Sequence, residues 1–187
     1  MDLKSLLRCC FVLFCGQSFS LGCRWVRYRY KDVSRENLQL LANMGGEFVR
    51  EKVNIPFPNK VYSNARHSQM GDSISILYKA IRQIRKLYSK DMNSVTWDSV
   101  KLDQFKSNLH RTTSELEQCM REITYSDSTG SHGKENRSLK RHFKKLEHYL
   151  KTKDYSANAW EVVRTEVWKH LQRLDLLTTA MRTGTNA

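Results

Sequence analysis

The chain has 187 residues, 40% hydrophobic and 27% charged, which is ordinary for a soluble globular protein and enough for one domain with a core. No apolar run approaches the roughly 20 residues that a transmembrane helix needs, which excludes a membrane-inserted protein. The 32 Lys and Arg outnumber the 19 Asp and Glu, and the formal net charge of +13 suits a nucleic acid, heparan sulfate or an acidic protein surface as partner.

Residues 1–22 predict a secretory signal peptide. Lys4 and Arg8 flank the short apolar run CCFVLFC, and small residues precede a cut before Cys23. The alternative is a buried N-terminal helix. Removal of the signal peptide takes away a net charge of +1, which leaves +12 on residues 23–187. We therefore expect one domain, secreted into the extracellular space.

Two of the five cysteines, Cys23 and Cys119, remain after removal of the signal. Because the secretory compartment is oxidising, a disulfide between them is expected, with two free thiols as the alternative. A bridge that closes a loop of nearly a hundred residues stabilises the folded state by roughly 4–5 kcal/mol in the chain-entropy model.

The apolar residues from Cys23 to Met44 recur at spacings of three and four, which predicts a first helix. Gly45-Gly46 is expected to end it with a left-handed exit. Residues 45–70 lack clean periodicity and hold the only two prolines, Pro56 and Pro58. They therefore predict a long extended connection.

Two further helices follow this connection. The second starts near Asp72 or Ser73, either of which can cap it. The third has a heptad seam from Leu102 to Ile123 that places Cys119 on the buried stripe. The stripe expected for the second helix is Ile74, Leu77, Tyr78, Ile81, Ile84 and Tyr88.

The last third of the chain predicts two closely joined helices. A polar loop ends in the sequon at Asn136, a predicted N-glycosylation site. Asp154 or Ser156 can cap the fifth helix, and residues 178–187 read as a frayed tail. The fourth helix is expected to bury Leu139, Phe143, Leu146 and Leu150, with His142 on its basic opposite face, and the fifth to bury Trp160, Val163, Val167, Leu171 and Leu174.

The fold class expected is all-α: a helical cytokine bundle of about five long helices with long crossover connections. Catalytic motifs are missing, since the sequence has neither G-x-S-x-G nor H-E-x-x-H, and GSHGK lacks the spacing of a phosphate loop. The six histidines read as isolated surface residues, so neither a metal site nor a cofactor is expected. Aromatic residues lie on the apolar stripes instead of beside the basic residues, which argues against a nucleic-acid module.

The segment from Arg141 to Val167, RHFKKLEHYLKTKDYSANAWEVVRTEV, resembles the signature region of type I interferons. That pattern ends in C-A-W-E-V-V-R, which here reads NAWEVVR from Asn158 to Arg164. Many tetrapod members pair the Cys of this motif with one in the first long loop, and both are missing here. With Cys23 and Cys119 as the remaining pair, the chain looks like the two-cysteine group of fish type I interferons.

The resemblance implies a type I interferon-like bundle that bridges two different class II cytokine receptor chains, signals through Janus kinases and STAT proteins, and induces antiviral genes. In the family, one receptor chain contacts the first helix, the long loop and the last helix, and the other contacts the second and third helices. The residues implied by register are Arg164, Trp168 and Lys169 on the last helix, Val49, Arg50 and Lys52 in the loop, and Lys79, Arg82, Arg85 and Lys86 on the second helix.

Each implied residue has an alternative reading. Arg164 could pair with Glu161 or Glu166, and Trp168 could pack at the edge of the stripe. Replacement of Arg164 by Ala is expected to weaken receptor binding without changing the melting temperature. Trp160 is expected in the core. A monomer with weak heparan sulfate binding is expected. The alternative functions are an interleukin-10-like cytokine and a cationic antimicrobial or heparin-binding protein.

Overall fold

The computed structural model describes residues 21–49, 53–126 and 133–183, and this part of the chain is all helical, with no strand. The prediction of an all-α helical bundle is confirmed. The helices are α2 (Leu21–Tyr28), α3 (Tyr30–Met44), α4 (Asn59–Arg66), α5 (Met70–Leu87), α6 (Ser99–Ser126), α7 (Gly133–Thr152) and α8 (Ala157–Thr183).

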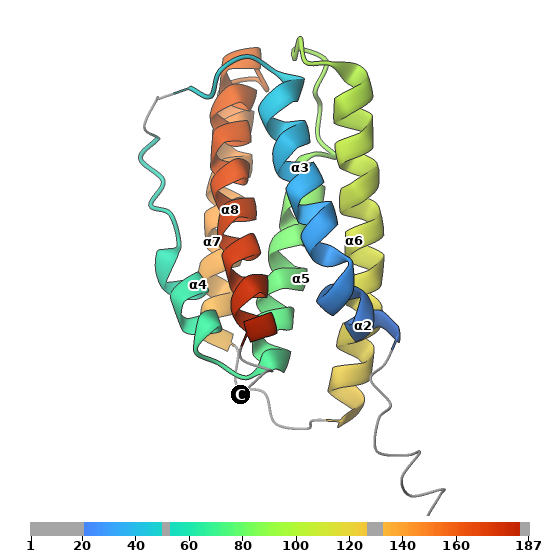
Figure 1. Cartoon of the computed structure of the whole chain (residues 1–187). Helices are drawn as coiled ribbons and strands as arrows, with labels where there is room; N and C mark the ends of the chain where they lie inside the picture. Colours follow the sequence, from blue (N-terminus) through green and yellow to red (C-terminus); the bar gives the residue numbers. More distant parts are fainter. Residues whose placement is uncertain (1–20, 50–52, 127–132, 184–187) are drawn as a thin grey trace, which may run out of the picture.

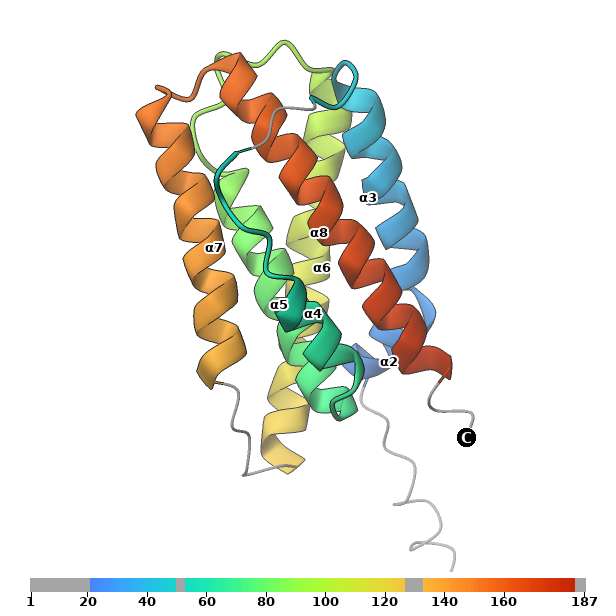
Figure 2. The same cartoon turned by 90° about the vertical axis from the view of Figure 1, so that its left-hand side faces the viewer.

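The long helices form one bundle in which α3, α5 and α7 run in one direction and α6 and α8 run in the other (Figure 1). Helix α3 packs against α6 and α8, and α5 packs against α6, α7 and α8. Because α3 and α5 are parallel, the chain between them must return along the whole bundle. In Figure 2 this connection crosses the side formed by α7 and α8 and ends in α4, which contacts both helices.

The predicted apolar stripes form the core of the bundle. The heptad seam of α6 is buried from Leu102 to Cys119, and Trp160 of α8 is fully buried, as expected. The indole Nε1 of Trp160 donates to the carbonyl oxygen of Asp91 at 2.9 Å, so its polar atom is also satisfied. The buried residues of the other stripes include Ile74, Leu77, Ile81, Ile84, Tyr88, Leu139, Phe143, Leu146, Leu150, Val163, Val167, Leu171 and Leu174.

The first helix and the first connection differ from the prediction. The helix is divided at Arg29 into α2 and α3. Gly45 ends α3 with φ −123° and ψ −170°, which is extended backbone and not the expected left-handed exit. The connection is not extended throughout, because α4 folds near its end and buries Val61 and Tyr62.

Helix boundaries account for the other differences. Helix α5 begins at Met70, so Ser73 lies inside it, where its hydroxyl donates to the carbonyl oxygen of Ala65 at 2.7 Å. Helix α8 continues to Thr183, and Thr178 is buried, so the predicted frayed tail is wrong for residues 178–183. Residues 1–20, which hold most of the predicted signal peptide, and residues 184–187 lie outside the described residues.

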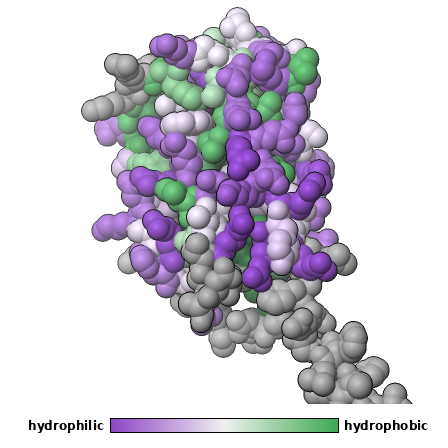
Figure 3. Space-filling model, in the orientation of Figure 1, coloured by the Kyte–Doolittle hydropathy of each residue, from purple (hydrophilic) through white to green (hydrophobic). Residues whose placement is uncertain are grey.

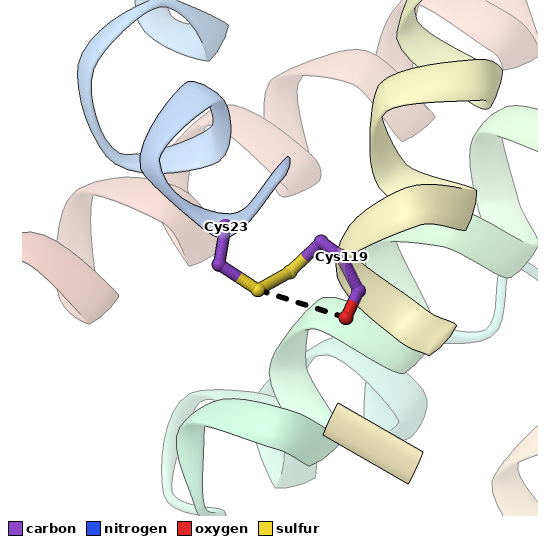
Figure 4. The surroundings of a disulfide bond; sticks show 2 residues. All are labelled: Cys23 and Cys119. Carbon is purple, nitrogen blue, oxygen red and sulfur yellow. Dashed lines mark hydrogen bonds between the residues drawn. A yellow bond between two sulfur atoms is a disulfide. The ribbon is translucent and has the colours of Figure 1, made fainter. Parts of the chain in front are cut away.

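A disulfide joins Cys23 of α2 to Cys119 of α6, with the two Cα atoms 4.7 Å apart (Figure 4). Both the pairing and the buried position of Cys119 agree with the sequence prediction. The bridge fastens the short α2 to the far end of α6, beside the buried Trp25 and Val26. Among the described residues, no helix is long and apolar enough to cross a membrane.

Candidate functional site

Arg164 of α8 is fully buried, with 0% of its surface exposed. Its Nη1 donates to the carbonyl oxygen of Leu41 at 2.6 Å, and its Nη2 donates to that of Gly46 at 2.5 Å. Its Nε donates to Oε2 of Glu161, one turn earlier on α8, at 2.8 Å. These bonds join the last long helix to the end of α3 and the start of the long connection.

Aromatic rings enclose the same guanidinium. Its Cζ atom lies 4.4 Å from the ring centroid of Phe48 and 5.8 Å from that of Trp97, within the range of cation–π attraction. Gly45 allows this packing by its lack of a side chain, because a Cβ atom there would lie 2.9 Å from the Trp97 ring and 3.1 Å from Cζ of Arg164. Residues 45–48 are therefore fixed against α8.

The burial of Arg164 corrects the prediction that this residue faces a receptor. The alternative partner Glu161 does form the ion pair, at 2.7 Å, while Glu166 pairs with Lys169. For the same reason, Ala at this position should lower the melting temperature, contrary to the expectation from the sequence. Arg164 holds the connection in place and does not itself lie on the surface.

Trp168 and Lys169 follow one turn further along α8 and do reach the surface. The ring centroid of Trp168 lies 5.0 Å from that of Phe48, so the ring that stacks on Arg164 also packs on this half-buried indole. The side chain of Lys169 is 49% exposed, and its Nζ pairs with Oε1 of Glu166 at 2.7 Å. These two residues stay candidates for contact with a partner.

A groove of about 560 Å³ opens beside them, between α3, the connection and α8. Leu38, Phe57 and Leu176 give it apolar surface, and Leu176 is 47% exposed. On the face of α3 and α8 seen in Figure 3, apolar patches lie between hydrophilic side chains. An apolar patch with a polar rim is the usual composition of a protein–protein contact. The polar residues of the groove are Asn59, Lys169, Gln172, Arg173 and Asp175.

The three candidates in the loop are only partly covered by the structure. Val49 is half-buried, directly after Phe48. Arg50 and Lys52 lie outside the described residues. All three therefore remain predictions.

A buried histidine pair lies under the connection, between α7 and α8. The ring centroids of His142 and His170 are 4.9 Å apart, and His170 also packs on Phe57 and Phe143 at 4.5 and 4.6 Å. Nδ1 of His142 lies 3.1 Å from the carbonyl oxygen of Pro56. The pair thus fixes the middle of the connection, as Arg164 fixes its start.

The burial of both residues corrects the prediction that the histidines are isolated surface residues. His142 and His170 are 4% and 0% exposed. Tyr62 lies 2.6 Å from Nδ1 of His170, and burial raises the pKa of its hydroxyl, so this hydroxyl stays protonated and donates. Within the described ranges, no group of three or more His, Cys, Asp or Glu could hold a metal ion.

These histidines predict that the protein loses stability in mild acid. Burial lowers the pKa of His142 and lowers that of His170 well below 6.5. The unfolded state therefore takes up protons first, and stability present above about pH 6.5 is lost as the pH falls, by up to about 1.4 kcal/mol per pH unit for His170. Urea unfolding between pH 7.5 and 5.5 measures this slope.

Two matched variants test the origin of that slope. His170→Gln should flatten the dependence of unfolding free energy on pH, even though it lowers stability at every pH. His148→Gln, which changes an exposed histidine on the same helix as His142, should leave the slope unchanged. An unchanged slope in His170→Gln would contradict the account.

The basic candidates of α5 lie on a different face. Lys79, Arg82, Arg85 and Lys86 line a groove of about 660 Å³ between α5 and α7, together with Lys140. Lys79 is half-buried and donates to the hydroxyl of Ser75 at 2.8 Å, and the burial lowers the pKa of its amine. The remaining lining residues are Gln83, Ser89, Asn136 and Leu139.

The chain matches the family model described as the interferon alpha/beta domain over residues 26–181. Interferon a3 of Oncorhynchus mykiss is 38% identical over 175 residues, which cover 92% of this chain and 95% of that protein. Interferon omega-1 of Bos taurus is 30% identical over 172 residues, with 89% and 87% covered.

Solved structures give the same result. Zebrafish interferon 1 superimposes with a TM-score of 0.77 at 34% identity, over 86% of this chain and 100% of that one. Zebrafish interferon 2 superimposes with a TM-score of 0.66 at 27% identity, over 78% and 96%. The chain therefore belongs to the type I interferon family, together with interferons of fish, and is a cytokine.

Proposed function

We propose that this protein is a secreted antiviral cytokine that bridges two different class II cytokine receptor chains and induces antiviral genes through Janus kinases and STAT proteins. Family membership supports the cytokine role. The observation that carries the receptor proposal is the surface where α3, the connection and α8 meet. The buried Arg164 and the buried histidine pair fix the backbone beneath that surface through contacts with backbone carbonyl oxygens. We propose no enzymatic activity.

The first receptor chain is proposed to bind the groove beside Trp168 and Lys169. Residues 45–48 and 56–57 are already held in place in the free protein, so little conformational entropy is lost when the complex forms. The exposed apolar side chain of Leu176 would lie in the core of such a contact, with the polar Arg173 and Asp175 at its rim. The second chain is proposed to bind from the side of α5 and α6.

Leu176→Glu should weaken binding of the first receptor chain by tenfold or more, because it places a charge in the apolar part of the groove. Val100→Glu is the matched control, since Val100 is 74% exposed on α6, away from this groove. Surface plasmon resonance with the purified receptor ectodomain measures both affinities. Equal affinity for the two variants would remove the groove from the receptor contact.

The function itself is tested on cells that express defined pairs of receptor chains. Residues 23–187 with the disulfide formed should induce antiviral genes only where both chains are present. No induction in any pair from the correct species would contradict the proposal. Light scattering of the same protein tests the expected monomer.

A further inference from the structure

Among the described residues, the groove between α5 and α7 is lined by five cationic side chains and by no carboxylate. Lys86 is partly neutralised, since its Nζ lies 3.3 Å from Glu147, which also pairs with Lys90. Arg82, Arg85 and Lys140 form no ion pair in the part of the chain that the structure describes. The groove therefore has a positive charge that the protein itself does not balance.

The cationic side chains of this groove are arranged in a line. On α5 the spacing of Lys79, Arg82 and Lys86 is three and four residues, which places them along one side of the helix over roughly 10 Å. Lys140 lies across the groove on α7. Such a track is complementary to an extended chain of regularly spaced anions.

The lining also lacks what a protein partner usually needs. Of the lining residues that the structure describes, Leu139 is the one apolar residue, it is buried, and none is aromatic. Energetic centres of protein–protein contacts are enriched in Trp, Tyr and Arg, and this groove supplies the arginines without an aromatic residue beside them. A polyanion needs mainly cations. The composition thus favours an anionic polymer over a folded protein.

We propose that the groove between α5 and α7 binds a sulfated polysaccharide of the heparan sulfate type. Sulfate groups would pair with Arg82, Arg85 and Lys140, and the long side chains of Lys79 and Lys86 would follow the polymer. A polysaccharide bound here would compete with any receptor chain that docks on the same side of α5. The proposal does not depend on the antiviral function.

Asn136, the asparagine of the sequon, lines the same groove. It is half-buried, and its Oδ1 atom is buried without a hydrogen-bond partner among the described residues. An N-glycan attached to its amide would lie over the cationic residues. Glycosylation and polysaccharide binding would therefore exclude one another, and a glycoform verified by mass spectrometry should bind heparin less tightly than the bare protein.

The test uses heparin and unglycosylated protein with its disulfide formed. The double variant Arg82→Ala/Arg85→Ala should bind heparin roughly 30-fold more weakly than the parent protein near physiological salt, if each cation contributes as it does at other anionic surfaces. Lys31→Ala/Arg35→Ala is the matched control, because it removes two exposed cations from α3 and should change affinity little. Circular dichroism melting confirms that both variants fold.

A second pair of variants tests the groove without removing a cation. Asn136→Glu places a carboxylate among the cations and should weaken heparin binding. Asn136→Gln, whose side chain has the size and shape of Glu without the charge, should not. Equal losses in the two double variants, or full affinity in Arg82→Ala/Arg85→Ala, would overturn the proposal.

Signalling assays distinguish a failure of this inference from a failure of the proposed function. In cells without glycosaminoglycans, Arg82→Ala/Arg85→Ala should signal like the parent protein. Lost signalling there with unchanged heparin affinity would assign the groove to a receptor chain and overturn the proposal. If the parent protein does not signal at all but binds heparin through the groove, the proposed function fails and this inference stands.

Discussion

Arg164→Ala should destabilise the protein by about 3–5 kcal/mol and lower its melting temperature by about 10 °C. The change removes the four hydrogen bonds of the guanidinium and leaves the carbonyl oxygens of Leu41 and Gly46 without their donor. It also opens a cavity between Phe48 and Trp97. Urea unfolding at pH 7.5 gives the free energy, and differential scanning calorimetry gives the melting temperature.

Arg173→Ala is the control for this prediction, because Arg173 is an exposed arginine on the same helix with one long contact, to Asn59 at 3.4 Å. It should change stability by less than about 0.5 kcal/mol. Arg164→Lys should recover only part of the loss, since an ammonium cannot make the forked contacts of a guanidinium. A melting temperature for Arg164→Ala equal to that of Arg173→Ala would show that the buried arginine does not hold the connection.

Loss of the disulfide is the second large effect expected. Cys23→Ser/Cys119→Ser should lower the free energy of unfolding by about 4–5 kcal/mol, because the bridge closes a loop with a sequence separation of 96. Domains of this kind have about 5–15 kcal/mol of stability in total, so the variant should unfold in a far lower concentration of urea.

Reductant provides the control for the bridge. It should destabilise the parent protein by a similar amount and have no further effect on the double serine variant. Peptide mapping of the oxidised protein should recover the fragment that joins Cys23 to Cys119. A reduced parent protein that unfolds at the same urea concentration as the oxidised one would contradict the stabilising role.

The long helices could be predicted because each buries one stripe against the others. Residues of α6 from Leu102 to Cys119 follow the spacing of three and four that a packed helix requires, and they are buried. The short helices could not be predicted in this way. Helix α4 has eight residues, too few for a periodic pattern, and it depends on packing of Val61 and Tyr62 against its neighbours.

The spacing of the buried polar residues along their helices already indicated burial, but their polar side chains are ordinarily taken as exposed. Arg164 follows Trp160 by four residues and precedes Val167 by three, so it lies on the buried stripe of α8, and His170 continues this stripe three residues after Val167. His142 has the same relation to its own stripe on α7, three residues after Leu139.

The contacts that permit their burial could not be found in the sequence. The carbonyl oxygens that accept hydrogen bonds from Arg164 are 118 and 123 residues away, and the one beside His142 is 86 residues away. Local spacing predicts the face of a helix, but only the folded connection supplies these partners. The spacing thus places the three polar residues on the stripes. For Arg164 and His142, the distant carbonyl oxygens offset the free-energy cost of removing a polar side chain from water.

The central claim is that the surface formed by α3, the connection and α8 binds the first receptor chain. Hydrogen–deuterium exchange of the disulfide-linked protein, free and bound to the purified ectodomain of that chain, tests it most directly. We predict that protection on binding is concentrated in residues 45–59 and 168–176. Protection confined to α6 and α7, with unchanged exchange in α8 and the connection, would contradict the claim.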